Sequence, residues 1–515
     1  MQDIAGVLRR VVPDAYYVGG VVRDALLKKP SGDIDLALPK EQVKPAALAL
    51  AKALKAAVFE MDAEFGVWRL VTRAENLQID LTAFQGKNLR EDLLRRDFTF
   101  NALAYPVTAP LTVEVHTAKG QKAQVRLKKL QKKWLVDLKG GLADLTARQI
   151  RLTNPRVFQD DPLRMLRVFR HAAELKFTIT PAVLKQMKKD APLIVQSAGE
   201  RVQEELTRMF RTPRAYPCVL QMEQTGLLTA LFPILEDQRT CAECYYGKGG
   251  VLKHTLNCFK REEWLLENLQ KAFPKYYKKL APFVTDKALF KMAVLLHDIA
   301  KPSTAKMKGG RLRFFYHEQH GARMARKLLD ALHYSKADNR LICAMIGEHL
   351  RPSNLASNDV ITDRGAYKFF RDLGDAAIPM LLLCWADYTS YISDAQLRRI
   401  LPRSAERVMS LERAKQTANV GKTLRHMQVL SLLLKKYFES PKKIHPTKLI
   451  DGRDIMQALQ IGPSPLVGEL LEAVALAQVE GQVTDKASAL AFVKAHAAAN
   501  VQSEQKAAKN AKQLV

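Results

Sequence analysis

Residues 16–36 read YYVGGVVRDALLKKPSGDIDL. An apolar run ends at Gly19 and Gly20, and the following VVRDALL has the pattern of a helix start. Two small residues at such a turn let a phosphate approach backbone N–H groups, so we expect an anion site there. Asp33 and Asp35 follow in a second short strand, where alternation points both carboxylates to one face. Paired carboxylates suit Mg²⁺ and predict a two-metal site for displacement at phosphorus.

A Gly-Gly turn followed at this distance by Asp-Ile-Asp-Leu resembles the signature of the DNA polymerase β-type nucleotidyltransferase superfamily. The resemblance implies a third catalytic carboxylate in an apolar strand, and Asp80 in the run Gln78-Ile79-Asp80-Leu81 fits that place. An Asp that faces solvent on an edge strand is the competing interpretation of Asp80. The catalytic set implied by the resemblance is Asp33, Asp35 and Asp80, with Mg²⁺ on the first two.

Four motifs then stand in the order of one family. They are GGVVRDALL from Gly19, RRDFTFNALAY at 95–105, DDPLRMLRVFR at 160–170 and GERVQEEL at 199–206. Together they resemble the class II tRNA nucleotidyltransferase and bacterial poly(A) polymerase family, and DGRDIMQALQIGPSPLVGELLEAV from Asp451 resembles its C-terminal region more loosely. The resemblance implies an enzyme that uses CTP and ATP to extend the 3′ end of tRNA without a nucleic-acid template.

The resemblance also implies which residues bind the nucleotide. These are Gly19, Gly20, Arg23, Arg95, Arg96, Asp97, Asn101, Asp161, Arg164 and Arg167. The spacing of three residues predicts that Asp161 and Arg164 are neighbours on one helix surface. The resemblance implies that they pair with the Watson–Crick edge of the incoming base, and Arg167 would continue the row toward the triphosphate. A salt-bridged amphipathic helix is the competing interpretation of this segment. Asp160 also departs from the Glu that is usual in the family.

The link between Asp80 and Glu91 is short. Many family members that add CCA carry a longer flexible loop here, and loss of that loop is associated with enzymes that add only the two cytidines. The main interpretation is addition of C and A to the tRNA 3′ end. Since a mobile loop could reshape the pocket between C and A selection, we hypothesise, as a narrower alternative, that this chain adds only CC. Poly(A) polymerase is the closest alternative. A non-catalytic RNA-binding protein with hydrolase activity elsewhere is the alternative from another class.

A second constellation follows in the helical part of the chain. The order of His254, His297-Asp298 and Asp387 resembles the HD phosphohydrolase superfamily, and further ligands are expected from the same resemblance. The metal ligands implied are His254, His297, Asp298, His320, His349 and Asp387. Imidazoles and carboxylates that converge from separate helices can bind a divalent transition metal and activate water for phosphoester hydrolysis. A degraded, non-catalytic domain is the competing interpretation.

Composition agrees with a nucleic-acid partner. The chain has 515 residues and carries 81 Lys and Arg against 53 Asp and Glu, a formal net charge of +28 that favours binding to RNA phosphates.

The six cysteines include one close pair, Cys241 and Cys244, which lacks the second pair of a four-thiolate zinc site, so free thiols are expected. No apolar stretch reaches the length of a membrane span and the N-terminus does not resemble a secretory signal, so we expect a cytoplasmic protein.

The spacing of apolar residues changes near Ile150, from short strands mixed with helices to helical periodicity. We therefore predict an α+β N-terminal head with the small mixed sheet of polymerase β-like nucleotidyltransferases, followed by an all-α neck, body, HD domain and tail. The predicted ranges are 1–150 for the head, 151–245 for a neck and body that bind RNA and nucleotide, 246–400 for the HD domain and 401–515 for a helical C-terminal region with a basic tail.

Overall fold

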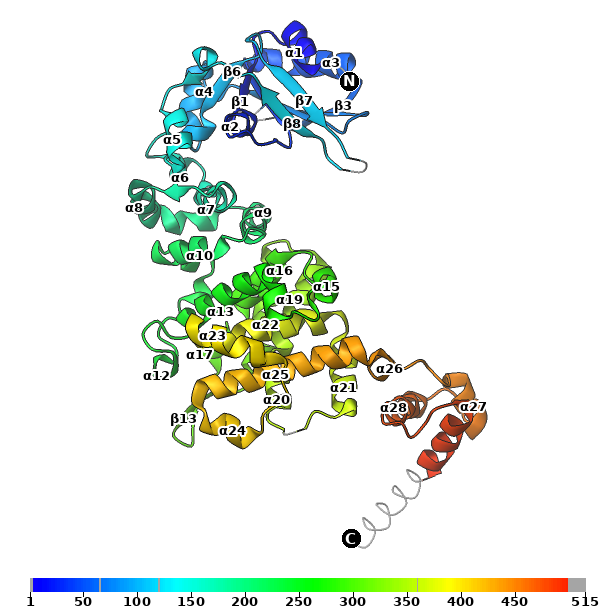
Figure 1. The fold of residues 1–515 in the computed structure, drawn as a ribbon. Helices are drawn as coiled ribbons and strands as arrows, with labels where there is room; N and C mark the ends of the chain where they lie inside the picture. Colours follow the sequence, from blue (N-terminus) through cyan, green and yellow to red (C-terminus); the bar gives the residue numbers. More distant parts are fainter. Residues whose placement is uncertain (1–2, 64–65, 119–120, 359, 499–515) are drawn as a thin grey trace, which may run out of the picture. The chain divides into compact units, whose positions relative to one another are not determined.

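The computed structural model describes residues 3–63, 66–118, 121–358 and 360–498. The chain divides into two compact units, Met1–Pro233 and Ile234–Val515. In Figure 1 the first unit runs from blue to green and the second from green to red. The division falls inside the range 151–245 predicted for a neck and body. The predicted basic tail after Gln502 lies outside the described residues.

A mixed seven-stranded sheet forms the centre of the head, in the order β3-β4-β5-β2-β1-β6-β9 (Figure 1). Its strands are β1 (Tyr16–Val18), β2 (Ile34–Leu38), β3 (Ala56–Asp62), β4 (Val67–Thr72), β5 (Gln78–Ala83), β6 (Leu103–Pro106) and β9 (Val136–Asp137). β2 and β5 are parallel, whereas the other neighbouring pairs in this order are antiparallel. The predicted α+β head with a small mixed sheet is confirmed.

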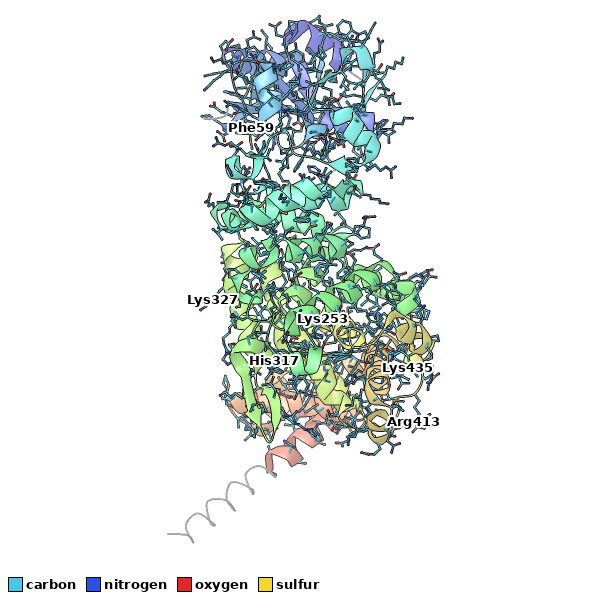
Figure 2. The ribbon with its side chains drawn as sticks, turned by 90° about the vertical axis from the view of Figure 1, so that its left-hand side faces the viewer. Phe59, Lys253, His317, Lys327, Arg413 and Lys435 are labelled. Atoms are coloured by element: carbon cyan, nitrogen blue, oxygen red, sulfur yellow. The ribbon has the colours of Figure 1, made fainter. Side chains whose placement is uncertain are left out.

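The helix α3 (Lys40–Leu54) packs on β3, β4 and β5 through a row of small and branched apolar residues that includes the buried Leu50. Its Ala/Leu periodicity predicts a helix that continues to Ala57, but the helix ends earlier because Lys55 adopts a left-handed conformation with φ of 51°. The chain then enters the edge strand β3. Phe59 on this strand is 44% exposed (Figure 2).

Two connections bring the ends of the central strands together. α2 (Gly20–Leu26) links β1 to β2, and the hairpin of β7 (Thr112–His116) and β8 (Gln124–Lys128) contacts α2. A bridge between Ser31 and Val125 joins this hairpin to the residues just before β2. The residues that lead into β2 are therefore held by α2 and by the hairpin of β7 and β8.

Beyond Ile150 the first unit is mainly helical. α7 (Arg164–Leu175) packs on α9 (Gly199–Phe210), and a buried ion pair of 2.6 Å between Arg170 Nε and Glu205 Oε2 joins the two helices. Such a buried pair leaves an uncompensated charge when one partner is removed, so it ties the two helices to one arrangement.

The second unit has a core of helices that pack against one another. They are α13 (Gly250–Glu267), α16 (Lys287–Leu296), α18 (His317–Ala331), α19 (Lys336–Glu348), α22 (Ala377–Thr389) and α25 (Ala418–Glu439). Trp385 is 1% exposed and stacks on Trp264, with 5.6 Å between ring centroids, which fixes α22 against α13. The predicted helical region after the head is confirmed.

Other elements of the second unit are smaller. β12 (Ala305–Lys308) and β13 (Arg311–Phe314) form a hairpin before α18. α27 (Gly452–Leu459) and α28 (Pro465–Val479) enclose a separate small core around Ile455. Within the described ranges, each helix is too short or too polar to cross a bilayer.

Candidate active site and metal centre

Three carboxylates meet where β2 enters the sheet. Asp33 immediately precedes the strand, Asp35 is its second residue, and the parallel pairing sets Asp35 beside Asp80 on β5. Burial, followed by the charges of Asp33 and Asp80, raises the pKa of Asp35 to about 7. Carboxylates that disfavour one another's ionisation in this way form a site where a hard divalent cation replaces the proton. The donor set therefore fits Mg²⁺.

Asp80 is held from the neighbouring strand. Arg69 on β4 donates to its two oxygens through Nε and Nη2, both at 2.8 Å, and Gln78 Nε2 donates at 2.9 Å. Asp80 is 9% exposed and lies on an inner strand of the sheet, so the interpretation as a solvent-facing edge residue does not apply.

The Gly-Gly turn lies over Asp35. Gly19 has a φ of 66°, a conformation that disfavours residues with a Cβ. A Cβ there would lie 3.2 Å from Arg96 Nη1, and a Cβ on either glycine would lie 3.6 Å from Asp35 Oδ2. The absence of side chains at Gly19 and Gly20 thus keeps the approach to this carboxylate open.

Arg23 and Asn101 belong to one network above the sheet. Arg23 donates to both oxygens of Asp24, at 2.8 and 2.9 Å, and its Nη1 donates to Asn101 Oδ1 at 2.9 Å. Asn101 Nδ2 in turn donates to Asp97 Oδ1 at 3.2 Å. Arg23 is therefore oriented by acceptors on Asp24 and Asn101.

The network continues to α7 through Asp97 and Arg167. Arg167 Nη2 lies 2.8 Å from Asp97 Oδ2. Burial alone would raise the pKa of Asp97, but the charges of Arg167 and Arg164 and the Asn101 hydrogen bond lower it below its usual value. Of the two arginines that precede Asp97, Arg96 donates to Asp92 at 2.9 Å and faces Gly19, whereas Arg95 is exposed on the last turn of α4 (Leu89–Arg95).

Asp161 and Arg164 lie together, but not on one helix as predicted. Asp161 ends the short helix α6 (Val157–Asp160) in an extended conformation, because a residue before proline disfavours the helical region and Pro162 follows. Its Oδ1 accepts the N–H of Leu163 at 3.1 Å, and α7 begins at Arg164. Arg201 on α9 donates to Asp161 Oδ2 at 2.9 Å, a contact that the sequence did not indicate.

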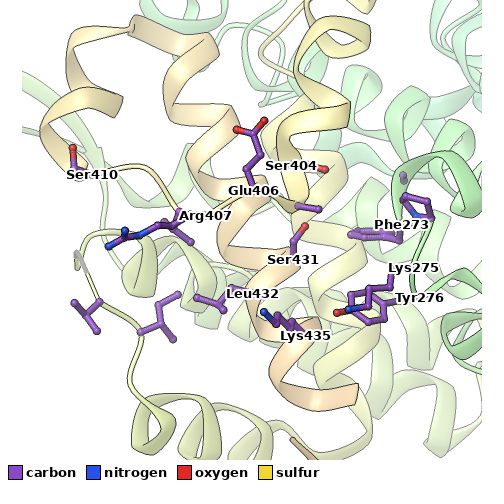
Figure 3. A pocket seen from close by; sticks show the side chains of 16 residues that line it. Phe273, Lys275, Tyr276, Ser404, Glu406, Arg407, Ser410, Ser431, Leu432 and Lys435 are labelled. Carbon is purple, nitrogen blue, oxygen red and sulfur yellow. The ribbon is translucent and has the colours of Figure 1, made fainter. Parts of the chain in front are cut away.

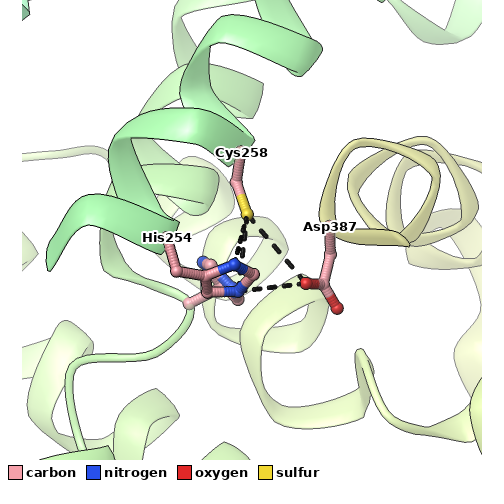
Figure 4. Close-up of side chains that lie close together, drawn as sticks. His254, Cys258 and Asp387 are labelled. Atoms are coloured by element: carbon pink, nitrogen blue, oxygen red, sulfur yellow. Dashed lines mark hydrogen bonds and ion pairs between the residues drawn. The ribbon is translucent and has the colours of Figure 1, made fainter. Parts of the chain in front are cut away.

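In the second unit, four side chains from three helical segments form one polar group. They are His254, Cys258, His297 and Asp387, whose ligand-type atoms all lie within 4.8 Å of one another. His254 Nε2 lies 3.2 Å from Asp387 Oδ1 (Figure 4). Three of the four residues were predicted, and Cys258 was missed although it follows His254 at the i+4 spacing of a helix face.

Asp298, His317 and His349 form a second group beside the first. Asp298 Oδ2 lies 3.2 Å from His297 Nε2, and Asp298 Oδ1 lies 3.4 Å from His317 Nε2, so its two oxygens face the two groups. His317 at the start of α18 takes the place predicted for His320, which is exposed one turn later (Figure 2). Of the six predicted ligands, the structure brings five together.

Backbone carbonyls orient the imidazoles of this centre. Nδ1 of His297, His317 and His349 lies 2.7 to 2.8 Å from a carbonyl oxygen three residues earlier, which turns each Nε2 toward the two groups. Such contacts fix the tautomer of metal-binding histidines. Burial and the charge of His297 lower the pKa of His349 to about 3. Against the effect of burial, the charge of Cys258 raises the pKa of His254 and the charge of Asp298 raises that of His297 well above the usual value, so a metal ion at these two rings would have to displace protons.

Buried polar atoms without partners support the same assignment. His297 Nε2 lies 3.2 Å from Asp298 Oδ2, and His317 Nε2 lies 3.4 Å from Asp298 Oδ1, yet within the described residues the two nitrogens and Asp298 Oδ1 are buried and make no hydrogen bond of acceptable geometry. Leaving such atoms unsatisfied is costly, and a metal ion would satisfy them together. The charge of Lys301, 2.6 Å from Asp298 Oδ2, helps to lower the pKa of this carboxyl well below its usual range against the effect of burial. The donor set fits a divalent transition metal.

A cavity of about 1000 Å³ opens elsewhere in the second unit, between the segment around Phe273 and Tyr276 and the helix α25 (Figure 3). Its lining includes the aromatic rings of these two residues and the basic Lys275, Arg407 and Lys435. No ligand-type residue of the two metal groups lines it. The cavity is therefore separate from both sites of candidate chemistry.

Three family models match successive parts of the chain. A model described as poly A polymerase head domain matches residues 15–151. One described as a probable RNA and SrmB-binding site of polymerase A matches residues 176–239, and an HD domain model matches residues 251–392. The matches cover the head carboxylates and all of the metal ligand groups of the second unit.

Relatives similar over nearly their whole length have related names. An A-adding tRNA nucleotidyltransferase of Deinococcus radiodurans is 30% identical, over 93% of this chain and 95% of that protein. A CC-adding tRNA nucleotidyltransferase of a Synechocystis species is 26% identical, over 95% of each. The fold is similar to a Thermotoga maritima CCA-adding enzyme complexed with tRNA, with a TM-score of 0.57 and 19% identity over 96% of this chain and 98% of that one. The extent of these matches shows that the chain belongs to the tRNA nucleotidyltransferase family.

Proposed function

We propose that this chain adds cytidine to the 3′ end of tRNA from CTP, and that it stops after two. The observation that carries the reaction type is the register that sets Asp35 beside Asp80 under the open Gly19-Gly20 turn. In the reaction the terminal ribose hydroxyl attacks the α-phosphorus of the nucleotide, a new P–O bond forms, and the bond to pyrophosphate breaks.

Nucleotidyltransferase heads use divalent cations, and we infer Mg²⁺ here, with Asp33 and Asp35 as the residues that would hold it. When bound, the cations would stabilise the attacking and the leaving oxygen of the in-line displacement. Asp80 supplies a third negative charge whose position Arg69 fixes. Gly19 and Gly20 leave room for the triphosphate, and Arg96, which faces Gly19, places positive charge beside it.

Asp161 and Arg164 are proposed to read the incoming base. Arg201 holds one oxygen of Asp161 and the backbone N–H of Leu163 holds the other, so the carboxylate has a defined direction before substrate arrives. Arg164, at the first position of α7, adds the donors that a cytosine edge needs. These oriented side chains would thereby select the incoming base in place of a nucleic-acid template.

The limit to two cytidines rests on the connection between β5 and α4. β5 ends at Ala83 and α4 begins at Leu89, so only residues 84–88 lie between them. Gln85 N–H donates to Asp92 Oδ1 at 3.0 Å, and Glu91 Oε2 accepts the N–H of Lys87 at 3.0 Å. A short link tied down in this way leaves little chain to reshape the nucleotide pocket from C to A selection.

A tRNA extension assay tests this proposal. Purified protein is given tRNA that lacks CCA or tRNA that ends in CC, with CTP alone, ATP alone and both together, and the products are sequenced. Addition of two cytidines with no adenosine in the combined reaction is expected. A complete CCA end would contradict the limit to CC, and addition of A only to tRNA that already ends in CC would assign the chain the other partial activity. A long A tail from ATP alone would favour a poly(A) polymerase.

For the second unit we propose hydrolysis of a phosphoester at an RNA end, such as a 2′,3′-cyclic phosphate or a phosphomonoester. HD domains use divalent metals, and the bridging position of Asp298 between two imidazole-containing groups supports two metal ions that would activate water. RNA with either end group is the test substrate. His297→Ala should abolish hydrolysis and leave nucleotide addition intact, with Cys343→Ser as a matched variant on a nearby helix. Equal hydrolysis in the two variants would reject this activity.

A further inference from the structure

Cys258 lies one helical turn after His254 on α13, so the two side chains project from the same face of the helix. Its Sγ lies 3.5 Å from His254 Nε2 and 3.9 Å from Asp387 Oδ1. Figure 4 shows the thiol, the imidazole and the carboxylate pointing toward one another from α13 and α22. Cys258 is 1% exposed, yet its sulfur faces charged and polar groups.

We propose that Cys258 is a metal ligand of the HD centre and completes, with His254, His297 and Asp387, a four-coordinate site for a thiophilic divalent ion such as Zn²⁺. This inference rests on the proposed HD metal centre and adds a sulfur donor to it. Tetrahedral Zn²⁺ with ordinary bond lengths to S, N and O has ligand-to-ligand edges of about 3.3 to 3.6 Å. The three edges among Cys258, His254 and Asp387 measure 3.5, 3.9 and 3.2 Å.

His297 supplies an independent indication that a ligand belongs in this group. Its ring is 1% exposed, and its Nδ1 is engaged by the carbonyl oxygen of Val294 at 2.7 Å. Its Nε2 lies 3.2 Å from Asp298 Oδ2 but makes no hydrogen bond of acceptable geometry in the described part of the chain. Its ligand atom lies within 4.8 Å of those of His254, Cys258 and Asp387. A cation at the centre of the four would therefore satisfy this nitrogen and the sulfur at once.

Another buried thiol of the same unit shows the alternative, in which a cysteine only fills space. Cys343 on α19 donates to Asn339 Oδ1 at 3.1 Å and to the carbonyl oxygen of Ala322 at 3.4 Å, and it belongs to neither metal group. Cys258 instead lies between an imidazole and a carboxylate that also contact each other. The surroundings of Cys258 are those of a ligand, and Cys343 is its natural control.

The sulfur makes the two groups chemically unequal. The first combines thiolate, imidazole and carboxylate donors, whereas Asp298, His317 and His349 offer only nitrogen and oxygen. Thiolate selects softer ions such as Zn²⁺, while carboxylate and imidazole also accept harder ions such as Mn²⁺. Asp298 lies between the two groups, with Oδ2 3.2 Å from His297 Nε2 and Oδ1 3.4 Å from His317 Nε2, so two ions of different preference would be neighbours.

Cobalt spectroscopy tests the ligand directly, without measuring activity. The parent is the full-length chain with Cys241→Ala and Cys244→Ala, because this pair has the one CxxC spacing in the sequence and would bind Co²⁺ itself. Co²⁺ should produce a thiolate-to-metal charge-transfer band in the near ultraviolet. Cys258→Ser in this parent should lose the band and weaken Zn²⁺ binding by at least about tenfold, whereas Cys343→Ser keeps both. Cys258→Ala serves as a second variant, and thermal melting shows that each is folded.

The outcomes separate the ligand from the centre. Loss of the band in both Cys258 variants, with folded protein and retained Co²⁺ binding at other donors, supports Cys258 as a ligand. Co²⁺ that binds without the band, together with unchanged Zn²⁺ affinity in Cys258→Ser, overturns the role of Cys258 and leaves the HD metal centre intact. If His297→Ala removes no bound Co²⁺ or Zn²⁺ from the parent, the metal centre fails, and the inference about Cys258 fails with it.

Discussion

Asp35 and Asp80 are direct partners in the parallel pairing of β2 and β5. In a parallel pair, residues in register project to the same face, so the carboxylate at the start of one strand is brought beside a carboxylate from a distant part of the chain. Burial and the charges of Asp33 and Asp80 raise the pKa of Asp35 to about 7. The arrangement that brings these carboxylates close enough to repel one another is also one that suits a divalent cation.

Replacing Asp35 with Asn should abolish nucleotide addition. The change keeps the size of the side chain but removes a negative charge that would hold the cation, and we expect CTP incorporation to fall by at least about 10³-fold. Incorporation of labelled CTP into tRNA that lacks CCA measures the effect. Glu60→Gln, on the exposed side of the edge strand β3, removes the same charge from the head and should retain full activity. An Asp35→Asn variant that works normally would exclude the proposed site.

The pH dependence of stability should reveal the raised pKa of Asp35. Because the folded pKa of about 7 exceeds the ordinary value of 3.8, the contribution of Asp35 to stability is fully present below pH 3.8 and is lost as the pH rises to about 7. Asp35→Asn escapes this loss. The metal-free variant should be more stable than the metal-free parent by about 2 to 4 kcal/mol at pH 8, with little difference at pH 4. Denaturant unfolding at the two pH values measures the gap, and an equal gap at both would contradict the assignment.

Arg167 is expected to act mainly through Asp97. Removing a positive partner leaves a carboxylate that is 5% exposed without its ion pair. Arg167→Met should therefore lower the free energy of unfolding by about 2 kcal/mol or more, and adding Asp97→Asn should recover part of the loss. Thermal and denaturant unfolding of the two single variants and the double variant measure this coupling. Additive losses would instead indicate that Arg167 is free to bind substrate.

Base selection should depend on Arg164. Arg164→Ala removes donors beside the oriented carboxylate of Asp161, so the ratio of CTP to UTP incorporation is expected to fall by about tenfold or more. Competition between labelled CTP and UTP on the same tRNA gives this ratio. Arg156→Ala removes an exposed arginine from the same region and should leave the ratio unchanged. If Arg164→Ala slows both nucleotides equally, Arg164 does not read the base.

The local sequence pattern was sufficient to predict the turn at Gly19 and the helical part of the chain. It was not sufficient to predict where helices are interrupted. The i+3 spacing of Asp161 and Arg164 predicts one continuous helix, whereas Pro162 forces an extended residue before it and starts a new helix. The predicted proximity of the two residues still holds, because only residues 161–163 lie between the two helices and the N–H of Arg164 donates to the carbonyl oxygen of Asp161 at 3.1 Å. The Arg201 contact to Asp161 depends on the packing of α9 against α7, which no local pattern reports.

The HD ligands show a second limit of sequence reasoning. His317 and His320 are three residues apart at the start of α18, and spacing alone cannot tell which of the two faces the centre. The structure decides through packing, since the hairpin of β12 and β13 places the carbonyl oxygen of Phe314 2.8 Å from His317 Nδ1. The i+4 spacing of His254 and Cys258 was visible in the sequence. It indicates a candidate metal ligand only because the fold places Asp387 beside both residues.

This difference between neighbouring histidines leads to a paired test of the metal centre. His317→Ala removes a nitrogen that faces Asp298 Oδ1 at 3.4 Å, so metal bound per chain should fall, by up to one ion, after purification in excess Mn²⁺ or Zn²⁺ and removal of free metal. His320→Ala removes an exposed ring from the same helix and should retain the parent content. Elemental analysis of the three proteins gives the comparison. Equal metal content in parent and His317→Ala would remove this residue from the centre, and a loss confined to His320→Ala would restore the assignment that the sequence alone suggested.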